Sequence, residues 1–578
     1  MSRSPRRPPA EPAVDGGPGL ALVVLAALAV LVTAADTYVV VLALPDILTG
    51  VGVGLDELQR ATPVVGGFLL GYTATLPLLG RLADLRGRVP VLVGCLLVFA
   101  LGSLLTATAH SLGPAVLGRG LQGVGAGGLV PATLALVADR WPPERRALPL
   151  GVVGAVQEAG AVLGPLAGAA VLAVADWRAI FWLNLLLGVG LAAGVAWGAR
   201  RRADPVGLVL VAVAAASLAL LLAEPAALAE DVTVGLLWVP LAGASALTTP
   251  LALLGFAAGL AAGVRALRHP AGAVLPLRGL RRLAADVDVL GSLLVVVALG
   301  ALVWAFAAAD PADQVVAHGP LLLPVAAVAA GAFVVHERRA AAPVLPLAAL
   351  RPTGAWGALL VNVFVGVALV AALVDVPLFA RATTTPGDQL GAALVLHRLL
   401  IAVPVGAVAG GWLCRTLPPR VVASSGMAMA TVAFVAMTGW GERSLDDPWS
   451  TVVLAAAGLG FGLAIAPVNA VLLAVTRSEV HGTASALAVV ARTVGMLVGL
   501  SLLTAVALRR FTAEVAAIGS PVELCPDSPA DCVPYETAAE AAVLSQLHTV
   551  FAGAAIAAGL AAITALLLLR EVRTPARA

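Results

Sequence analysis

Lysine is absent from this chain of 578 residues, so all 35 basic residues are arginine. No lysine is available for any chemical role, and the abundance of alanine and valine suggests that a GC-rich genome causes the bias. Charged residues make up only 12% of the chain and aromatic residues only 4%, whereas 60% is hydrophobic and the mean hydropathy is +1.00. A soluble domain could not bury that much apolar surface. The composition predicts an all-α protein with many membrane-spanning helices.

The sequence also lacks a metal-ligand cluster, a nucleotide-binding loop and a nucleophile placed beside a base. These absences remove the support for a membrane enzyme or a sensor. We therefore expect no catalysis, no cofactor, no metal and no nucleic-acid partner.

The chain contains only four cysteines. Cys95 and Cys414 fall in or beside apolar stretches, where we expect them to pack. Cys525 and Cys532 lie seven residues apart in a polar, proline-rich loop. A disulfide is expected there if the loop is extracytoplasmic, and two unpaired thiols are the alternative.

Long apolar stretches recur along the whole chain, and a helix needs about 20 residues to cross the hydrocarbon core. The candidate spans fall near residues 20–44, 61–83, 89–109, 112–138, 147–173, 178–199, 205–223, 234–264, 287–308, 319–336, 355–379, 388–414, 421–440, 449–475, 482–508 and 544–569. The window at 234–264 contains Pro240 and Pro250, so we expect it to be broken or tilted, or to lie partly outside the bilayer.

These spans divide the chain into five parts. We expect a disordered cytoplasmic tail at 1–18, a six-helix half at 19–200, a linker region with two to four transmembrane helices at 203–340, a second six-helix half at 353–570 and a cytoplasmic tail at 571–578. The first apolar stretch is too long for a cleavable signal peptide.

Arginine is concentrated in every second connection between the spans. If the N-terminus is cytoplasmic, most arginines lie on the cytoplasmic side, as the positive-inside rule requires. Both termini are then cytoplasmic, and the loop with Cys525 and Cys532 lies outside.

The two six-helix parts repeat each other. Glycines of the fifth span recur with the same spacing in the penultimate span, since Gly151, Gly164 and Gly168 correspond to Gly482, Gly495 and Gly499. Two similar halves are typical of transporters built from parallel repeats.

The loop after the second span carries a glycine-framed group of charges. It reads Gly80-Arg81-Leu-Ala-Asp84-Leu-Arg86-Gly87-Arg88 and resembles the signature cytoplasmic loop of the major facilitator superfamily. Glycine allows a tight turn and a close helix approach. Asp84 is expected to cap a helix or to bridge to Arg88 in a closed state, which makes Asp84, Arg88 and Arg81 gating candidates. A solvated loop is the alternative.

Two further motifs resemble this superfamily. Arg119 begins an Arg-x-x-Gln-Gly sequence near the outer end of the fourth span, where it either influences a buried carboxylate or anion, or reaches the interface. The fifth span holds Gly164-Pro165-x-x-Gly168, which resembles the motif of drug:proton antiporters. Small residues let helices approach closely and proline adds a kink.

Glu158 lies about 11 residues into the fifth span, at roughly mid-membrane depth. An ionisable side chain at that depth is costly and therefore marks a functional site with a partner. The internal repeat aligns Arg492 with Ala161, one turn from Glu158. We predict an ion pair that forms in one state and opens in another, with a permanent structural salt bridge or two separately solvated residues as the alternatives.

Asp36 lies about two-thirds of the way across the first span. Its Asp-x-x-x-x-x-x-Ala-Leu-Pro context resembles the fourteen-helix drug:proton antiporters. Because desolvation favours the protonated form of a carboxyl group, Asp36 is a second proton-coupling candidate beside Glu158. A purely structural hydrogen bond is the alternative. Asp375 and the pair His397-Arg398 are further polar residues in spans, without an assigned role.

Within the superfamily, the chain resembles the mycobacterial triacylglyceride exporters. The shared sequences include Asp36-Thr-Tyr-Val-Val-Val, Gln157-Glu-x-Gly-x-Val-Leu-Gly-Pro165 and Val490-Ala-Arg492-x-x-Gly-Met-Leu-x-Gly. This resemblance implies a major facilitator fold of 14–16 spans and export of lipid from the inner membrane to a periplasmic lipoprotein. Residues about 203–270 add a hairpin that the family does not have.

Two functions compete. The first is proton-coupled export of a triacylglyceride-like lipid or another hydrophobic substrate by alternating access, by a monomer in the cytoplasmic membrane. The second is multidrug/proton antiport of amphipathic cations, which requires carboxylates facing the cavity. The small aromatic share of 4% disfavours an aromatic cage for cations.

Overall fold

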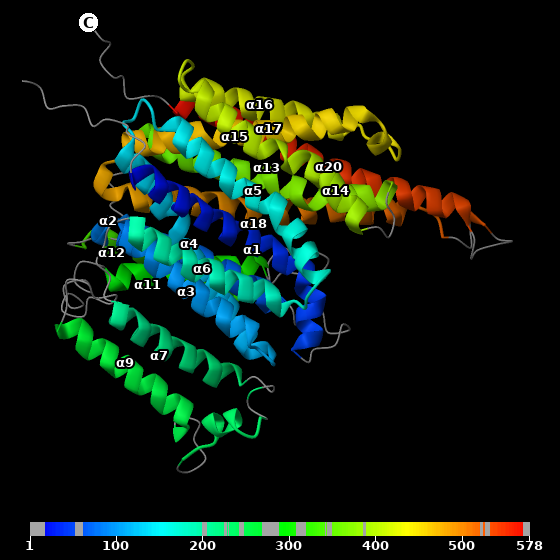
Figure 1. Cartoon of the computed structure of the whole chain (residues 1–578). Helices are drawn as coiled ribbons and strands as arrows, with labels where there is room; N and C mark the ends of the chain where they lie inside the picture. Colours follow the sequence, from blue (N-terminus) through cyan, green and yellow to red (C-terminus); the bar gives the residue numbers. More distant parts are fainter. Residues whose placement is uncertain are drawn as a thin grey trace, which may run out of the picture.

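The computed structural model describes residues 18–51, 62–198, 205–224, 228, 231–241, 248–268, 288–307, 319–340, 343, 350–384, 389–520, 524–525 and 532–569. The predicted tails at 1–18, apart from Pro18, and at 571–578 lie outside these residues. All long elements are helices, and they run side by side in one bundle (Figure 1).

Six helices cover the first predicted half. They are α1 (Pro18–Gly50), α2 (Thr62–Arg86), α3 (Arg88–Ala107), α4 (Leu112–Arg140), α5 (Ala147–Leu172) and α6 (Arg178–Gly198). Gly87 has a φ of +90°, a conformation that a side chain would strain, and this glycine separates α2 from α3.

In the described residues of the middle of the chain, four more long helices follow. They are α7 (Pro205–Ala223), α9 (Pro250–Arg268), α11 (Val289–Ala307) and α12 (Gly319–Glu337), with the short 3₁₀ helix η2 (Val234–Trp238) before α9. The apolar window at 234–264 is therefore broken, and its long helix begins only at Pro250, a position that proline tolerates. α7 and α9 pair at the lower edge of the view in Figure 1, and α11 packs against α2 and α18.

The last part contains α13 (Thr353–Thr383), α14 (Gln389–Leu400), α15 (Ala402–Leu413), α16 (Pro419–Met437), α17 (Pro448–Val475), α18 (His481–Ala517) and α20 (Val533–Leu568). α14 and α15 together fill one predicted span. Within the described residues, twelve helices are long and apolar enough to cross a membrane, and three shorter apolar helices lie at Val209–Leu221, Pro250–Arg265 and Leu290–Leu302.

The same helix pairings occur in both six-helix groups. α1 packs against α5 as α13 packs against α18, and α3 contacts α4 and α6 as α16 contacts α17 and α20. The glycine repeat in the sequence thus corresponds to equivalent positions in two similar bundles. Each bundle has its own buried core of alanine, valine, leucine and phenylalanine.

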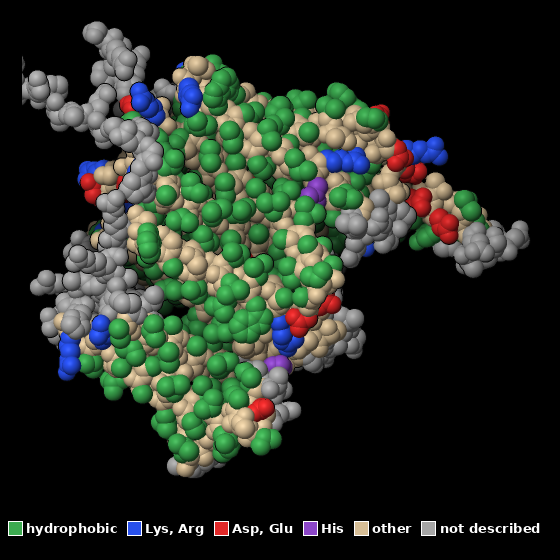
Figure 2. Space-filling view, in the orientation of Figure 1, with side chains coloured by type: hydrophobic (Ala, Val, Ile, Leu, Met, Phe, Trp, Pro, Cys, Tyr) green, Lys and Arg blue, Asp and Glu red, His purple; other side chains and the backbone are tan. Residues whose placement is uncertain are grey.

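The surface has an apolar middle and charged ends. On the face drawn in Figure 2, green apolar side chains cover the length of the helices, while arginine and acidic side chains gather toward the two ends. Since lipid tails make no hydrogen bonds, such a band is expected of a multi-pass membrane protein. We call the two ends the Asp84 end and the disulfide end, after the residues that they hold.

Two helices are much longer than a membrane requires. α18 has 37 residues and α20 has 36. At 1.5 Å per residue each is about 55 Å long, against a hydrocarbon core of about 30 Å. Figure 1 shows α20 projecting beyond the other helices at the disulfide end.

Candidate functional site

A pocket of about 550 Å³, including its open part, lies between the two six-helix groups. Helices α4 and α5 line it from one group, and α13, α17 and α18 line it from the other. Its apolar lining consists of Val130, Leu134, Gly154, Val365, Phe461, Ala464, Ile465, Val468, Ala488 and Val489. One phenylalanine is the only aromatic residue in this lining.

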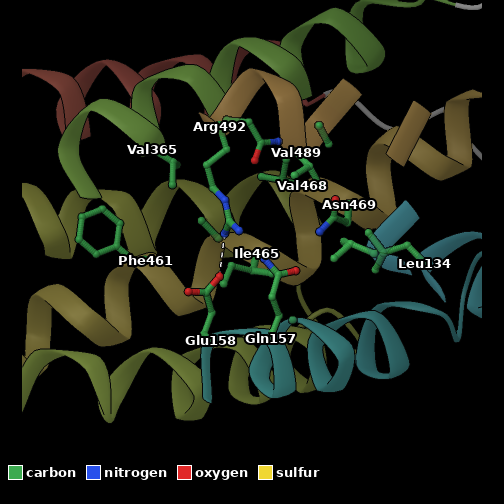
Figure 3. Close-up of a pocket in the computed structure, with 15 residues that line it drawn as sticks. Leu134, Gln157, Glu158, Val365, Phe461, Ile465, Val468, Asn469, Val489 and Arg492 are labelled. Atoms are coloured by element: carbon green, nitrogen blue, oxygen red, sulfur yellow. Dashed lines mark hydrogen bonds and ion pairs between the residues drawn. The ribbon is translucent and has the colours of Figure 1, made fainter. Parts of the chain in front are cut away.

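Glu158 and Arg492 meet in this pocket. Nη1 of Arg492 on α18 donates a hydrogen bond of 2.7 Å to Oε1 of Glu158 on α5 (Figure 3). The glutamate side chain is 13% exposed and the arginine side chain 19%, so both groups reach the pocket space. The pair joins the two six-helix groups at the depth that the repeat predicted.

Three uncharged amides complete the polar lining. Gln157 precedes Glu158 on α5, Asn469 lies on α17 and Asn362 lies on α13. Nδ2 of Asn362 donates to the carbonyl of Ala358 at 2.9 Å. The pocket thus offers several neutral hydrogen-bonding groups and a single carboxylate, and that carboxylate is already paired with an arginine.

Asp36 lies in a second charge pair, away from the pocket lining. Nη1 of Arg119 on α4 donates to Oδ2 of Asp36 on α1 at 2.6 Å, and Nδ2 of Asn184 on α6 donates to Oδ1 at 2.6 Å. Asp36 and Arg119 are each only 1% exposed. The first alternative for Arg119, an influence on a buried carboxylate, is the one that this geometry matches.

The surroundings of Arg119 hold it firmly. Nη1 also donates to Gln122 at 3.0 Å, and the amide of Gln122 donates to Ser103 at 2.9 Å. The guanidinium lies over the ring of Phe68, 4.5 Å from its centroid, and 6.0 Å from that of Phe181. Side chains from five helices, α1, α2, α3, α4 and α6, therefore converge around one buried ion pair.

The predicted loop motif closes the Asp84 end. The carboxylate of Asp84 accepts hydrogen bonds from the backbone N–H of Gly482 at 2.8 Å and of Thr483 at 2.9 Å, and from the Thr483 hydroxyl at 2.9 Å. It therefore caps the first turn of α18, where an acidic group also meets the positive end of the helix dipole. Arg88 pairs with Asp84 and donates to the Ser478 carbonyl at 3.0 Å.

One further contact ties the groups together at this end, because Arg146 donates to the Leu473 carbonyl at 3.0 Å. Within the first group, Arg88 also reaches Asp139 at 3.1 Å. The buried Nε atom of Arg81 has no hydrogen-bond partner among the described residues. Most of the inter-group hydrogen bonds among the described residues thus lie at the Asp84 end.

Glycines permit the close helix approach at the Asp84 end. A Cβ atom built on Gly80 would lie 2.6 Å from the carbonyl oxygen of Gly482. No real Cβ atom comes so close, so α2 and α18 can cross here only with glycine. In the antiporter-like motif on α5, Gly164 and Gly168 are buried and Pro165 lies within the helix, which packs against α1.

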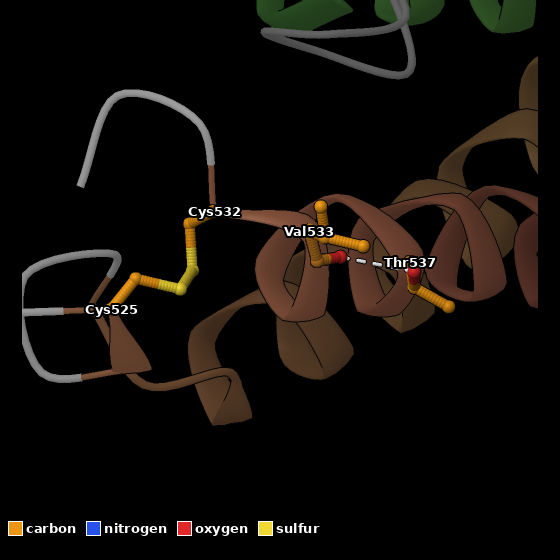
Figure 4. The surroundings of a disulfide bond; sticks show 4 residues. All are labelled: Cys525, Cys532, Val533 and Thr537. Carbon is orange, nitrogen blue, oxygen red and sulfur yellow. Dashed lines mark hydrogen bonds between the residues drawn. A yellow bond between two sulfur atoms is a disulfide. The ribbon is translucent and has the colours of Figure 1, made fainter. Parts of the chain in front are cut away.

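The sulfur atoms of Cys525 and Cys532 are bonded to each other, with a Cα–Cα distance of 5.6 Å (Figure 4). The bridge closes the connection between the long helices α18 and α20 at the disulfide end. Cys95 is buried, as a packing role requires.

Three polar residues of the predicted spans lie away from the pocket, namely Asp375, His397 and Arg398. Asp375 is 5% exposed and His397 is 9% exposed. Sequence reasoning also missed Asn184 as a ligand of Asp36 and Thr483 as a donor to Asp84. The motif Trp177-Arg-x-x-Phe-Trp-Leu-Asn184 held the signal for Asn184.

The comparisons with known proteins agree on one family. The sequence pattern of the Major Facilitator Superfamily matches residues 26–336. The triacylglyceride transporter of Mycolicibacterium hassiacum is 36% identical over 496 residues, which cover 84% of this chain and 78% of that protein. The triacylglyceride transporter of Mycobacterium tuberculosis strain H37Rv is 34% identical over 511 residues, which cover 86% and 84%.

A solved structure has the same fold. The human organic anion transporter MFSD10 superposes with a TM-score of 0.51 at 15% sequence identity, and the match covers 95% of this chain and 99% of that one. At this identity the similarity concerns the fold alone.

Proposed function

The chain belongs to the major facilitator superfamily, whose members are transporters and not enzymes, and from that premise we propose that it exports a triacylglyceride-like lipid from the inner membrane by proton-coupled alternating access. The observation that carries this proposal is the pocket, whose single carboxylate is neutralised by Arg492 within an aliphatic lining. The relatives named as triacylglyceride transporters support the choice of lipid.

The pocket chemistry suits a neutral ester. Gln157 and Asn469 are uncharged and carry amide N–H groups that can donate to ester carbonyl oxygens. The valine, leucine and isoleucine side chains around them favour acyl chains. A cationic drug would instead need a carboxylate that is free to balance its charge.

The orientation follows from charge and redox chemistry. We propose that the Asp84 end is cytoplasmic, because arginine is concentrated there and in the alternate loops. The disulfide between Cys525 and Cys532 suits the oxidising side of the membrane. Both termini are then cytoplasmic, and the long ends of α18 and α20 point toward a periplasmic acceptor, which we propose to be a lipoprotein.

The proposed cycle depends on switching one ion pair. In the conformation described, Asp84 caps α18, Arg88 bridges the groups and the cytoplasmic end is closed. Protonation of Glu158 removes the charge that Arg492 attracts, so the link between α5 and α18 weakens. The six-helix halves, which we place at 19–200 and 353–570, then rock about the central pocket while the linker region at 203–340 stays attached.

The second candidate is antiport of amphipathic cations, and the carboxylate of Glu158 in the pocket lining is the observation that favours it. The space of about 550 Å³ includes the open part of the pocket, and a lipid with three long acyl chains exceeds it. In the lipid model the acyl chains therefore extend beyond the pocket, between the helices and into the bilayer.

Reconstitution distinguishes the two candidates. The purified protein in liposomes is tested for transfer of a fluorescent triacylglyceride and for proton flux stimulated by cationic drugs. Lipid transfer without a drug response supports the proposal. Drug-stimulated proton flux without lipid transfer contradicts it and supports the antiporter.

A further inference from the structure

His397 connects the two six-helix groups at a place apart from the pocket. It lies on α14, and its imidazole is 9% exposed. Nδ1 lies 2.7 Å from the carbonyl oxygen of Ala393, one turn back on the same helix. Nε2 lies 3.2 Å from the carbonyl oxygen of Val162 on α5, in the other group.

Both ring nitrogens therefore face oxygen atoms that only accept hydrogen bonds. A neutral imidazole has one N–H, so its second nitrogen would direct a lone pair at a carbonyl oxygen. The imidazolium has two N–H groups and satisfies both contacts. Only the doubly protonated ring can donate in both contacts at once, and an ordinary imidazole changes charge between about pH 5 and 8.

Pro165 lies within one turn of this contact on α5. Proline has no N–H, so the carbonyl that loses its regular helical bond is that of Ala161, the residue before Val162. Val162 lies about 15 residues after the start of α5, about 22 Å from the Asp84 end and so in the half nearer the disulfide end.

Few charges surround this histidine. α14 packs against α5, α13, α15 and α17. The charged residues on these helices are Glu158 on α5, Asp375 and Arg381 on α13, and Arg398 on α14, while α15 and α17 have none within their bounds. Glu158 is paired with Arg492, and Arg398 donates to Thr451 on α17 at 3.2 Å. Within the described residues, the ring of His397 contacts two carbonyl oxygens and takes part in no ion pair.

We infer that His397 is a proton-dependent latch between α5 and α14, closed when its imidazolium donates to both Ala393 and Val162 and released when it loses a proton. This inference rests on the alternating-access part of the proposed function and adds a positioning residue to it. With the disulfide end outside, external protons would hold the outer half of this seam closed. Protonation of His397 would then precede closure, and this step would not depend on the Glu158–Arg492 pair.

The test measures the seam directly and needs no lipid substrate. Spin labels are attached at Leu166 on α5 and Leu394 on α14, which are 48% and 52% exposed and each within one turn of the contact. Cys95 and Cys414 are first replaced by alanine, and the disulfide is kept. Pulsed electron paramagnetic resonance on the protein in nanodiscs then gives the distance between the two labels at pH values from 5 to 8.

If His397 is a latch, the distance between the two spin labels increases as the pH rises. This pH-dependent step in the distance is lost in His397→Gln, whose amide does not titrate. Arg398→Gln, the matched control, keeps the step because that side chain binds α17. Glu158→Gln also keeps it, so failure of the lipid proposal leaves this result intact. A step that persists in His397→Gln, or its absence in the unsubstituted protein, overturns the inference. His397→Asn serves in the same way if the glutamine variant does not fold.

Discussion

At the scale of single residues, the protein contains two ion pairs with different surroundings. Asp36 and Arg119 are almost completely buried and are held by Asn184, Gln122 and the ring of Phe68. Glu158 and Arg492 are partly exposed to a pocket and join separate helical groups. A satisfied, buried pair rigidifies its surroundings, whereas a pair at a pocket can change partners. We therefore assign the switching role to Glu158, and proton coupling by Asp36 stays a prediction.

The buried pair is expected to be essential for stability. Arg119→Leu leaves the charge of Asp36 without its partner and should destabilise the protein by about 3–5 kcal/mol. The double variant Asp36→Asn with Arg119→Leu should recover part of this loss, because no charge is then left alone. Thermal unfolding in detergent measures both. An unchanged Tm for Arg119→Leu would contradict the structural role.

The amides of the pocket are expected to set affinity. Asn469→Leu removes a donor to an ester carbonyl, and one hydrogen bond contributes about 0.5–1.5 kcal/mol. Half-saturation of lipid transfer should therefore need roughly two- to tenfold more lipid. Gln546→Leu on α20, outside the pocket, is the control that should keep the original value. Equal values for Asn469→Leu and the unchanged protein would remove Asn469 from the site.

The Glu158–Arg492 pair was predictable because the membrane depth of Glu158 could be combined with the internal repeat of the two six-helix parts. Glu158 and Arg492 were matched through equivalent glycines, and no local signal was needed. Asp36 lacked such a guide, since Arg119 and Asn184 come from two other helices whose rotation no single sequence fixes. The partners of Asp36 depend on how three helices pack, and packing is decided by many small contacts at once.

At the scale of helices, the Asp84 end is closed by backbone contacts that only glycine allows. Gly482→Val places a branched side chain against the Gly80 carbonyl and the Asp84 carboxylate. We expect it to hold this end open, to abolish lipid transfer and to leave the helices folded. Gly331→Val is the control, because nothing lies within 4 Å of a Cβ built there.

Access to the pocket measures this opening. A cysteine introduced at Ile465 should react faster with an impermeant maleimide supplied from the Asp84 end in Gly482→Val than in the protein with Gly482. The Gly331→Val control should react at the original rate. Equal rates in all three proteins would mean that the glycine crossing does not gate the pocket.

Helix positions were largely predictable because a bilayer demands long apolar stretches. Each predicted window contains a helix, and the window with Pro240 and Pro250 is broken as expected. The way in which α11 packs against both α2 and α18 was not predictable, since an apolar helix offers equally apolar faces to lipid and to protein.

At the scale of the whole molecule, two similar bundles meet at one closed end and one central pocket. The repeated glycines predicted the two bundles, and the matching helix pairings confirm the fold. The conformation itself was not predictable, because a sequence specifies all states of a transporter together. Closure at the Asp84 end comes from the hydrogen bonds of Asp84, Arg88 and Arg146 to the other bundle.

The whole account depends on the charge of Glu158. Its most direct test is lipid transfer from proteoliposomes under an imposed pH gradient, with Glu158→Gln compared against Glu514→Gln, which alters an exposed pair on α18 outside the pocket. We predict gradient-dependent transfer in the unchanged protein and in Glu514→Gln, and a loss of at least about tenfold in folded Glu158→Gln, equivalent to about 1.4 kcal/mol. Full gradient-dependent transfer by Glu158→Gln would contradict the account.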